Sequence, residues 1–538
     1  MNNADLIVQI LKASGIKHGF GIPSGNVLPL MEAMRTGGID FVLTAHEGSA
    51  AFCADVSGRM TGRPGLCIAT LGPGATNLTT GVGSAFLDRS PLLAITCNLN
   101  VNQLGRRIQM YIDHHALFQP ITKASYSLRP GEIVATVKAA IQAALSEPQG
   151  PVHLDLPEDV ALAPADELAS AIVDGAIRGT PIPQAVEDAV FAKAEHLIGA
   201  AKHPVAVIGA SAMRMPDPGA LRRFVEKHNI PFATTTMAKG LIDEDHALAV
   251  GCIERARRQI QREFLRRADL IIGLGYDTIE VEYEAWIGHT SLLQVDIEPV
   301  DIVGSVNLAC EIVGDLDHSL ARLASIVATP NEWESSALET HRRAFNQALR
   351  PAADDLTPHE VIDLIRQNLP ADGILAFDVG AHTHQIASQW TAHAPRTFLI
   401  TNGWSSMGFG IPSAIAAKLA APDRPVACLI GDGCFQMTCG ELATAQRLGI
   451  ALPIVVLDDR SLSLINVKQI KRQYGNSGVN LDDGNLTEPP THYFGVPVRT
   501  ANNAASFAVA FTAALAASGP TVIEVKVDPA HYLETVFD

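Results

Sequence analysis

The residues with the clearest chemical potential are glycines and carboxylates that follow two apolar runs. Residues 426–430 are typical of a buried strand, and the tripeptide Gly-Asp-Gly at 431–433 follows at once. A helical pattern then leads to a second apolar run, residues 453–457, which ends in Asp458 and Asp459. The carboxylates therefore follow strand ends, and in open α/β sheets this edge is where ligands bind.

This pattern suits a diphosphate held with a divalent cation. Glycine at 431 and 433 lets the main chain approach an anion closely, and the N–H groups that open the following helix can bind diphosphate oxygens. Mg²⁺ prefers hard oxygen ligands, of which Asp432 and Asp459 supply two and the carbonyl of Ser461 a third. The alternative is an ordinary strand–helix–strand unit with polar loops, which a short glycine motif alone does not exclude.

The spacing between the two motifs is more specific. Twenty-four residues, 434–457, separate the Gly-Asp-Gly tripeptide from Asp458. This resembles the signature of thiamine diphosphate enzymes, in which a terminal Asn pair follows Gly-Asp-Gly after roughly two dozen residues. The resemblance implies that Asp459, the second residue of the pair, binds the metal. It also implies that Gly431, Gly433 and Cys434 bind the cofactor. The chain departs from the pattern by carrying Asp-Asp, which adds negative charge near a diphosphate.

Length and composition indicate what class of protein carries these residues. The chain has 538 residues, of which 47% are apolar and 18% charged, as expected for a soluble globular protein of about three or four domains. The net charge of −17 argues against a nucleic-acid or anionic-membrane partner. No apolar run is long enough to span a membrane, and the N-terminus lacks the basic region of a signal peptide. Eight cysteines without metal-ligand spacing indicate reduced thiols in the cytoplasm.

Alternating strand and helix patterns predict an α/β protein with three doubly wound, parallel-sheet domains. We expect an N-terminal domain at residues 1–165, a central domain at 185–335 and a C-terminal domain at 356–538. An Ala/Pro/Asp-rich linker at 166–190 and a polar, partly helical connector at 330–355 separate them. The resemblance implies that the first domain binds the cofactor's pyrimidine and the last its diphosphate and Mg²⁺.

Glu47 follows a predicted strand and begins a segment of small residues at helical spacing. By itself it is an acidic residue at a helix N-terminus, which the helix dipole favours. The stretch 46–48, however, resembles a segment of acetolactate synthases, and Gly-Pro-Gly-Ala-Thr-Asn at 72–77 resembles that family's next loop. The resemblance implies that Glu47 is the catalytic carboxylate against the aminopyrimidine ring, and that Gly72 and Asn77 bind the cofactor.

Two further segments are similar to the same family. Met407 lies 25 positions before Asp432, where the family places a bulky apolar residue between the two cofactor rings. A lone methionine is otherwise core filler. The segment Asp-Val-Gly-Ala-His at 378–382 resembles a family segment near the diphosphate, which implies that His382 contacts phosphate. The alternative is a solvated loop histidine.

The sequence motifs of the central domain and of the substrate site resemble the family less specifically than the cofactor motifs do. Residues 275–280 and the following Trp286 resemble catabolic, FAD-independent acetolactate synthases, and the Arg-Phe-Asp-Asp-Arg run of the flavin-dependent enzymes is missing, so no FAD is expected. Met110 occupies a position where the family often carries Gln, and Lys468 one where biosynthetic members carry an aromatic residue. The other expected substrate residues are His114, His115 and Leu464; surface histidines are the alternative for the first two.

The resemblance implies a thiamine diphosphate- and Mg²⁺-dependent enzyme that decarboxylates a 2-oxo acid and joins the product to a second carbonyl, as acetolactate synthases do. A decarboxylase that releases an aldehyde is the alternative. A second alternative is a non-enzymatic protein that keeps the fold. The presence of Glu47, Asp432 and Asp459 together argues against this alternative. Family architecture places Glu47 of one subunit against the Gly-Asp-Gly domain of another, so we expect a homodimer at minimum. A tetramer is common in the family.

Overall fold

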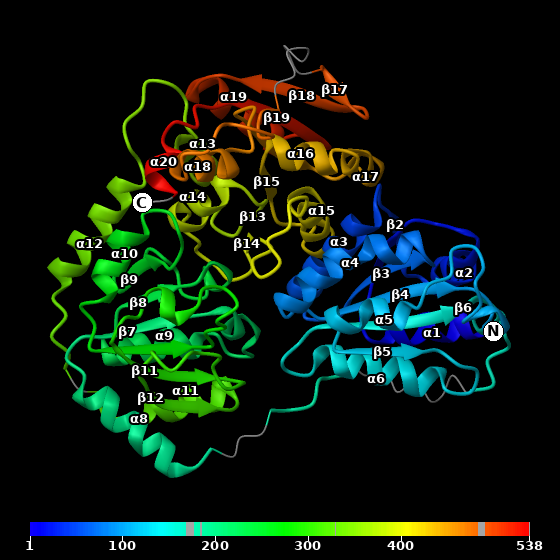
Figure 1. Cartoon of the computed structure of the whole chain (residues 1–538), viewed down its shortest axis with the longest axis horizontal. Helices are drawn as coiled ribbons and strands as arrows, with labels where there is room; N and C mark the ends of the chain where they lie inside the picture. Colours follow the sequence, from blue (N-terminus) through cyan, green and yellow to red (C-terminus); the bar gives the residue numbers. More distant parts are fainter. Residues whose placement is uncertain (168–176, 183–185, 329, 482–489, 537–538) are drawn as a thin grey trace.

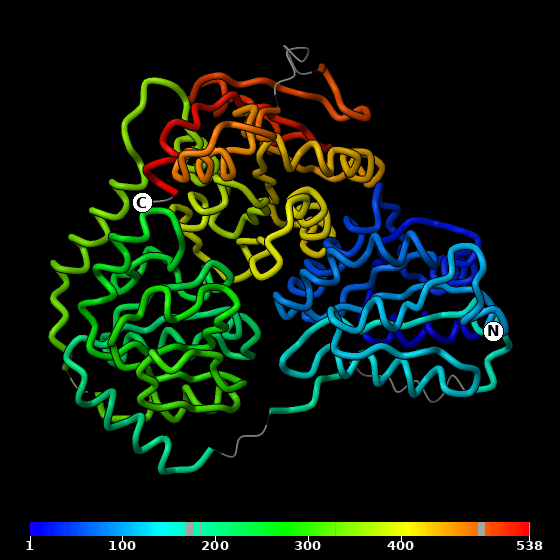
Figure 2. Tube along the Cα trace, in the orientation of Figure 1, coloured from blue at the N-terminus to red at the C-terminus, as the bar shows by residue number. Residues whose placement is uncertain are grey.

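The structure is a computed structural model that describes residues 1–167, 177–182, 186–328, 330–481 and 490–536. Three α/β units are visible in Figure 1, with the C-terminal unit, yellow to red, lying across the top of the N-terminal and central units. Figure 2 traces the chain through the three units in that order. Each unit is built on its own, mostly parallel sheet, which confirms the predicted fold class. The exact domain ranges remain a prediction, and residues 168–176 and 183–185 of the predicted linker lie outside the described part of the chain.

The N-terminal sheet has the strand order β2-β1-β3-β4-β6-β5, with every pairing parallel. Its central strands β3 and β4 are mostly apolar, and they are buried except at the last residue of β3, as expected when helices cover both faces of a parallel sheet. The strands are β1 (His18–Gly21), β2 (Asp40–Leu43), β3 (Gly65–Thr70), β4 (Leu92–Asn98), β5 (Ala124–Ser127) and β6 (Pro151–Pro157). The helices are α1 (Asn3–Ala13), α2 (Leu28–Gly37), α3 (Glu47–Thr61), α4 (Pro73–Leu87), α5 (His114–Phe118), α6 (Ile133–Leu145) and α7 (Glu158–Leu162).

The central sheet has the order β12-β11-β10-β7-β8-β9 and is also parallel. Its order reverses between β7 and β10, which makes the carboxyl ends of these two strands the natural ligand-binding edge. The strands are β7 (Pro204–Ile208), β8 (Phe232–Thr234), β9 (Ala249–Cys252), β10 (Leu270–Leu274), β11 (Ser291–Asp296) and β12 (Leu308–Val313). The helices are α8 (Asp188–Ala200), α9 (Gly219–His228), α10 (Arg258–Leu265) and α11 (Leu316–Ser325), and α12 (Ser335–Ala348) lies in the predicted connector.

The C-terminal sheet has the order β14-β13-β15-β16-β19-β18-β17, in which only the edge pair β17–β18 is antiparallel among the described residues. The order reverses between β13 and β15. The strands are β13 (Ile374–Phe377), β14 (Phe398–Leu399), β15 (Val426–Gly431), β16 (Leu452–Asp458), β17 (His492–Tyr493), β18 (Val496–Ala501) and β19 (Pro520–Lys526). The helices are α13 (Pro358–Asn368), α14 (Ala381–Gln389), α15 (Gly410–Ala420), α16 (Asp432–Thr438), α17 (Glu441–Leu448), α18 (Ser463–Lys471), α19 (Ala504–Leu515) and α20 (Tyr532–Thr535).

The N-terminal and C-terminal units share one hydrophobic core. Helix α3 packs against α15, and small side chains on both helices let the two backbones approach closely. The rings of Phe52 and Phe409 meet edge to face with their centroids 5.5 Å apart. Burial of this contact fixes the orientation of the two units, and with it the loops that begin α3 and precede α15.

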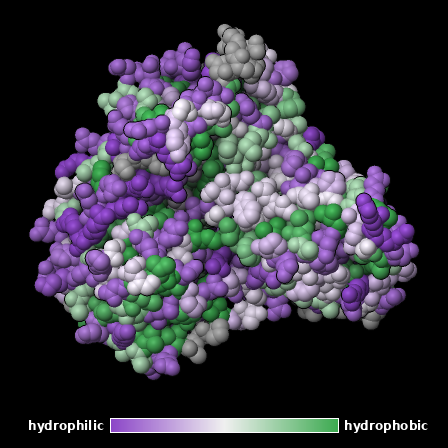
Figure 3. All heavy atoms as spheres, viewed as in Figure 1, coloured by the Kyte–Doolittle hydropathy of each residue, from purple (hydrophilic) through white to green (hydrophobic). Residues whose placement is uncertain are grey.

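The outer surface mixes polar and apolar side chains. Figure 3 shows hydrophilic residues gathered at the left edge of the visible face, over α12, while apolar residues are scattered between polar ones elsewhere. Among the described residues, the helices are too short or too polar to cross a membrane.

Candidate active site

A pocket of about 210 Å³ opens at the carboxyl edge of the C-terminal sheet. Its walls come from the ends of three adjacent strands: the segment 379–382 follows β13, the segment 431–434 begins at the last residue of β15, and the segment 459–465 follows β16. The site therefore lies beside the point where the strand order reverses, as in other open α/β sheets. The predicted residues that line it are His382, Met407, Gly431, Asp432, Gly433, Cys434, Asp459, Ser461 and Leu464.

The two predicted metal ligands are held as a pair of half-buried carboxylates. Asp432 accepts the N–H groups of Gly433 and Arg460, both at 2.7 Å. Asp459 accepts the N–H of Ser461 at 3.0 Å and the hydroxyl of Ser463 at 2.7 Å. Burial, reinforced by the Asp459 carboxylate, raises the pKa of Asp432 to about 7, and burial raises the pKa of Asp459 to about 6. A divalent cation between them would relieve both effects, so this donor set fits Mg²⁺.

The space beside these carboxylates depends on glycine. A side-chain Cβ on Gly433 would lie 2.7 Å from Leu462 Cδ2 and 3.3 Å from Met407 Cε, so a larger residue here would fill the pocket. Nε2 of His382 is buried and has no hydrogen-bond partner within the described part of the chain, so it is left available to a phosphate oxygen. Burial lowers the pKa of His382 to about 4, which keeps this imidazole neutral at pH 7. Three features of this pocket together fit a magnesium diphosphate group: the room left by Gly433, the unpartnered imidazole nitrogen of His382 and the paired carboxylates.

The predicted helical pattern that leads to the second apolar run corresponds to α17, which Gly449 caps, and a separate short helix, α16, begins at Asp432. The chain breaks between these two helices at residues 439–440. The break lets Glu441 begin a new helix and turn its carboxylate to the N-terminal unit. Glu441 accepts the N–H of Ala45 at 3.0 Å and that of His46 at 3.2 Å. It thereby holds the backbone immediately before Glu47.

The predicted pyrimidine-side residues form a separate cluster in the N-terminal unit. Glu47 is the first residue of α3, so the simple interpretation as a helix N-terminal acid also holds, and it is buried. The amide of Asn77 donates to its carboxylate at 3.0 Å. Gly72 has a φ of +61°, and a Cβ there would lie 2.4 Å from the carbonyl oxygen of Met110. Only glycine allows this close approach, which brings Met110 to the loop that begins α4.

The two histidines predicted near the substrate are fixed by internal hydrogen bonds. His114 is buried; its Nδ1 lies 2.9 Å from Asp155, and its Nε2 accepts the N–H of Gly72 at 3.3 Å. His115 is half-buried and bonds Ser125 and Ser127 at 2.6 and 2.9 Å. Neither is a solvated surface histidine, which was the alternative, and His114 positions the Gly72 turn.

The structure therefore brings the predicted residues together in two groups and not in one. Every described residue that lines the C-terminal pocket lies between Val379 and Tyr532, so Glu47, Asn77 and Met110 are not among them. Lys468 lies on α18, one turn beyond the pocket residue Leu464. Sequence reasoning missed several lining residues because they have no motif of their own: Ser405, Leu462, Ile465 and Tyr532. The last comes from the short C-terminal helix α20.

The binding edge of the central sheet is occupied by a side chain of the protein itself. The buried carboxylate of Glu280 accepts the N–H of Ala210 at 3.0 Å, which follows β7. It also accepts the hydroxyl of Thr235 at 2.6 Å and the N–H of Met237 at 2.9 Å, which follow β8. These three donors are therefore not available to an external anion.

Comparisons with known proteins agree with this arrangement. Three family descriptions match: the N-terminal thiamine pyrophosphate (TPP) binding domain at residues 1–121, the central domain of TPP enzymes at 191–323, and the C-terminal TPP binding domain at 378–525. A probable acetolactate synthase large subunit of Methanococcus aeolicus is 30% identical over 100% of this chain and 94% of its own length. The large subunit of the Escherichia coli acetolactate synthase isozyme 1 is 32% identical over 87% of this chain and 83% of its own length. The large subunit of isozyme 2 from the same organism is 29% identical over 98% of this chain and 96% of its own length.

Proposed function

Since this chain belongs to the acetolactate synthase family of thiamine diphosphate enzymes, we propose that it decarboxylates a 2-oxo acid and joins the remaining fragment to a second carbonyl compound. The observation that carries the proposal is the pair of half-buried carboxylates, Asp432 and Asp459, which share one pocket with the open space at Gly433 and a neutral imidazole. The relatives are named for a carboligation, which favours this reaction over simple aldehyde release.

The C-terminal pocket would hold the diphosphate end of the cofactor. Asp432, Asp459 and the carbonyl of Ser461 would bind Mg²⁺, and the segment from Gly431 to Cys434 would lie along the diphosphate. His382 would donate an N–H from Nε2 to a phosphate oxygen, and Met407 would separate the two rings. Thiamine diphosphate supplies the electron sink that allows carbon dioxide to leave. The protein contributes orientation, exclusion of water and the carboxylate of Glu47.

Glu47 would complete the site of a second copy of the chain. Its carboxylate lies in the N-terminal unit with Asn77, while the pocket walls come from residues 379–532 of the C-terminal unit. A C₂ dimer that pairs the N-terminal unit of each chain with the C-terminal unit of the other would create two equivalent sites. We therefore propose a homodimer as the minimal active form, and a tetramer would contain two such dimers.

The enzyme would work without FAD. Glu280 occupies the carboxyl edge of β7 and β8 and accepts three hydrogen bonds there. A flavin nucleotide bound at this edge would need the same backbone donors for its phosphates. The central unit therefore serves as a structural module.

The deciding experiment is a product screen of the full chain with pyruvate and larger 2-oxo acids, with thiamine diphosphate and Mg²⁺ but no added flavin. The expected products from pyruvate are carbon dioxide and 2-acetolactate, detected by mass spectrometry or as acetoin after acid treatment. Acetaldehyde as the sole organic product would indicate the non-ligating decarboxylase. No carbon dioxide from any 2-oxo acid would reject both reactions.

A further inference from the structure

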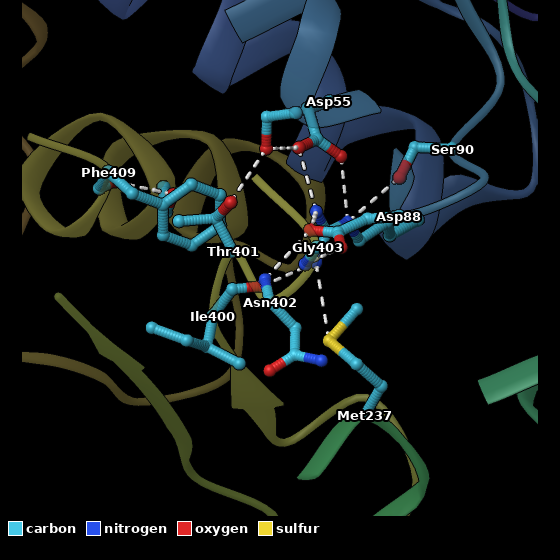
Figure 4. Close-up of polar contacts among 12 residues, drawn as sticks. Asp55, Asp88, Ser90, Met237, Ile400, Thr401, Asn402, Gly403 and Phe409 are labelled. Atoms are coloured by element: carbon cyan, nitrogen blue, oxygen red, sulfur yellow. Dashed lines mark hydrogen bonds and ion pairs between the residues drawn. The ribbon is translucent and has the colours of Figure 1, made fainter. Parts of the chain in front are cut away.

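The backbone segment 400–403 of the C-terminal unit is held by side chains of the N-terminal unit. Asp88, at the end of α4, accepts the N–H of Asn402 at 3.0 Å and that of Gly403 at 2.7 Å. Figure 4 shows Asp88 lying directly against Asn402 and Gly403, with Asp55 and Thr401 nearby. One carboxylate therefore fixes two consecutive peptide groups across the boundary between two units.

Asp88 is itself held by a half-buried arginine. Arg59 donates to Asp88 at 2.9 Å and makes a two-pronged ion pair with Asp55, with both contacts at 2.7 Å. Its remaining nitrogen donates to the carbonyl oxygen of Ile400 at 2.6 Å. Arg59 thus binds the segment 400–403 directly, and also through Asp88. The planar fork of five N–H donors makes this simultaneous contact possible, and a lysine ammonium cannot reproduce it.

Two further contacts belong to the same attachment. The hydroxyls of Ser84 and Thr401 lie 2.9 Å apart. The indole N–H of Trp404 donates to Thr80 at 3.2 Å, and the ring covers Gly83, where a Cβ would lie 2.8 Å from it. The segment from Ile400 to Trp404 is therefore fastened to α3 and α4 at every residue.

The attachment matters because the pocket begins immediately after this segment. Only four residues, 404–407, separate Gly403 from Gly408, and two of them, Ser405 and Met407, line the pocket. On the far side, Asp378 accepts the N–H of Gly408 at 3.0 Å and that of Gly410 at 2.8 Å. Met407 thus lies in a short span between two carboxylate anchors, one from its own unit and one from the N-terminal unit.

We propose that Asp88 and Arg59 are positioning residues that set the place of Met407 in the cofactor pocket. This inference rests on the proposed function, because it assigns Met407 to the cofactor. With Asp88 in place, both ends of the span are fixed and the Met407 side chain is held beside Gly433. Without it, the peptide groups of Asn402 and Gly403 lose their acceptor, and this end of the span is held only by the contacts of Ile400, Thr401 and Trp404. Cofactor binding must then order a looser span, and affinity falls.

The test is the variant Asp88→Asn, which keeps the shape but presents an amide group to two N–H donors. Titration calorimetry of the full chain with thiamine diphosphate in Mg²⁺ should show affinity weakened by about tenfold or more, because two charge-assisted hydrogen bonds are lost. At saturating cofactor, kcat should return to within about threefold of wild type, because Asp88 acts through binding and not on the reacting atoms. Amide hydrogen exchange of residues 400–404 should become faster in the free protein.

Glu244→Gln is the matched control. Glu244 is a half-buried carboxylate that also accepts a backbone N–H across a unit boundary, from Ala392 at 2.8 Å, and it pairs with Lys239 at 2.9 Å. It lies outside the pocket. This variant should lose stability but keep wild-type cofactor affinity and wild-type exchange at 400–404, which separates positioning from general loosening of the structure.

A milder variant, Thr401→Val, covers the case in which Asp88→Asn does not fold. It removes the contact with Ser84 without changing charge, and it should weaken cofactor affinity in the same direction by a smaller factor. Wild-type affinity in both variants, or equal losses in Asp88→Asn and Glu244→Gln, would overturn the inference. If the wild-type protein does not bind thiamine diphosphate, the proposed function fails instead.

Discussion

The side-chain amide of Asn77 donates a hydrogen bond to Oε2 of Glu47 across 3.0 Å, joining the first turns of two helices. The other carboxylate oxygen faces Gly74, where a Cβ would lie only 3.3 Å from it. Glu441 holds the two peptide groups before Glu47 from the opposite unit. Backbone and side chain of Glu47 are thus fixed by separate contacts, as a group that must meet a ring nitrogen at one position requires.

The first prediction concerns this carboxylate. Glu47→Gln should retain thiamine diphosphate but exchange the thiazolium C2 proton about 10²–10⁴-fold more slowly, the usual cost of losing a positioned acid–base group. Quenched-flow NMR of the bound cofactor measures the exchange. Exchange at the wild-type rate would show that another group activates the cofactor. Asn77→Ala should give a smaller loss, because the acid remains while its orientation is relaxed.

The second prediction concerns the metal. Asp459→Ala should lose Mg²⁺-dependent cofactor binding while its circular dichroism spectrum stays unchanged, because the pocket then offers one carboxylate in place of two. The adjacent Asp458→Ala is the control, since the family assigns the metal to the second residue of the pair. Calorimetry with thiamine diphosphate and Mg²⁺ distinguishes them. Equal affinity for thiamine diphosphate in the two variants would show that Asp459 is not a metal ligand.

The sequence predicted the C-terminal pocket better than the residues around it. Asp432, Asp459 and the two glycines follow strand ends at a spacing that local pattern and family resemblance both indicate. Glu441 and Asp88 could not be found in this way. Their role depends on which loop of another unit packs against them, and such a contact leaves no local pattern in the sequence. Tyr532 reaches the pocket from a four-residue helix at the far end of the chain, a contact that only the tertiary fold creates.

The third prediction tests the shared site. A mixture of Glu47→Gln and Asp459→Ala, each nearly inactive alone, should regain activity after subunit exchange. In a mixed dimer, the intact Glu47 of one chain faces the intact carboxylate pair of the other, so random pairing restores about a quarter of wild-type activity. Mixing two preparations of the same variant is the control. No recovery, despite mixed dimers detected by native mass spectrometry, would place both residues in the site of one chain.

The fourth prediction is a pH dependence of stability. Burial lowers the pKa of His153 to about 3 from an ordinary value of 6.5, and its ring is stacked on Phe118 with hydrogen bonds to Thr96 and Ser125. Between these two pH values His153 binds a proton in the unfolded chain but stays neutral in the folded chain. Stability should therefore fall as the pH drops from 6.5 toward 3, by up to about 1.4 kcal/mol per pH unit from this group.

Urea midpoints at pH 7 and pH 5 measure this dependence. His153→Gln should lose stability at pH 7 through poorer packing, but its stability should fall less between pH 7 and pH 5 than that of wild type. His289→Gln, at an exposed position, should behave as wild type at both values. An unchanged pH dependence in His153→Gln would show that other buried groups cause the acid sensitivity.

The last prediction concerns Lys468 and the choice of acceptor. Leu464 lines the pocket, and Lys468 follows it by four positions on α18, which places both on the same helix face. From that face an ammonium group would favour a substrate carboxylate over a neutral aldehyde. Lys468→Met should therefore raise KM for pyruvate by about two- to fivefold, the size of a half-exposed charge contact, with kcat nearly unchanged.

The control is Lys471→Met, which removes the same charge in the last turn of the same helix. It should leave KM for pyruvate unchanged, and both variants should accept a neutral aldehyde as well as the wild-type enzyme does. An equal rise of KM in the two variants would show that only the overall positive charge of the surface matters. A loss of affinity confined to Lys468, and to substrates with a carboxylate, would identify α18 as the element that selects the 2-oxo acid.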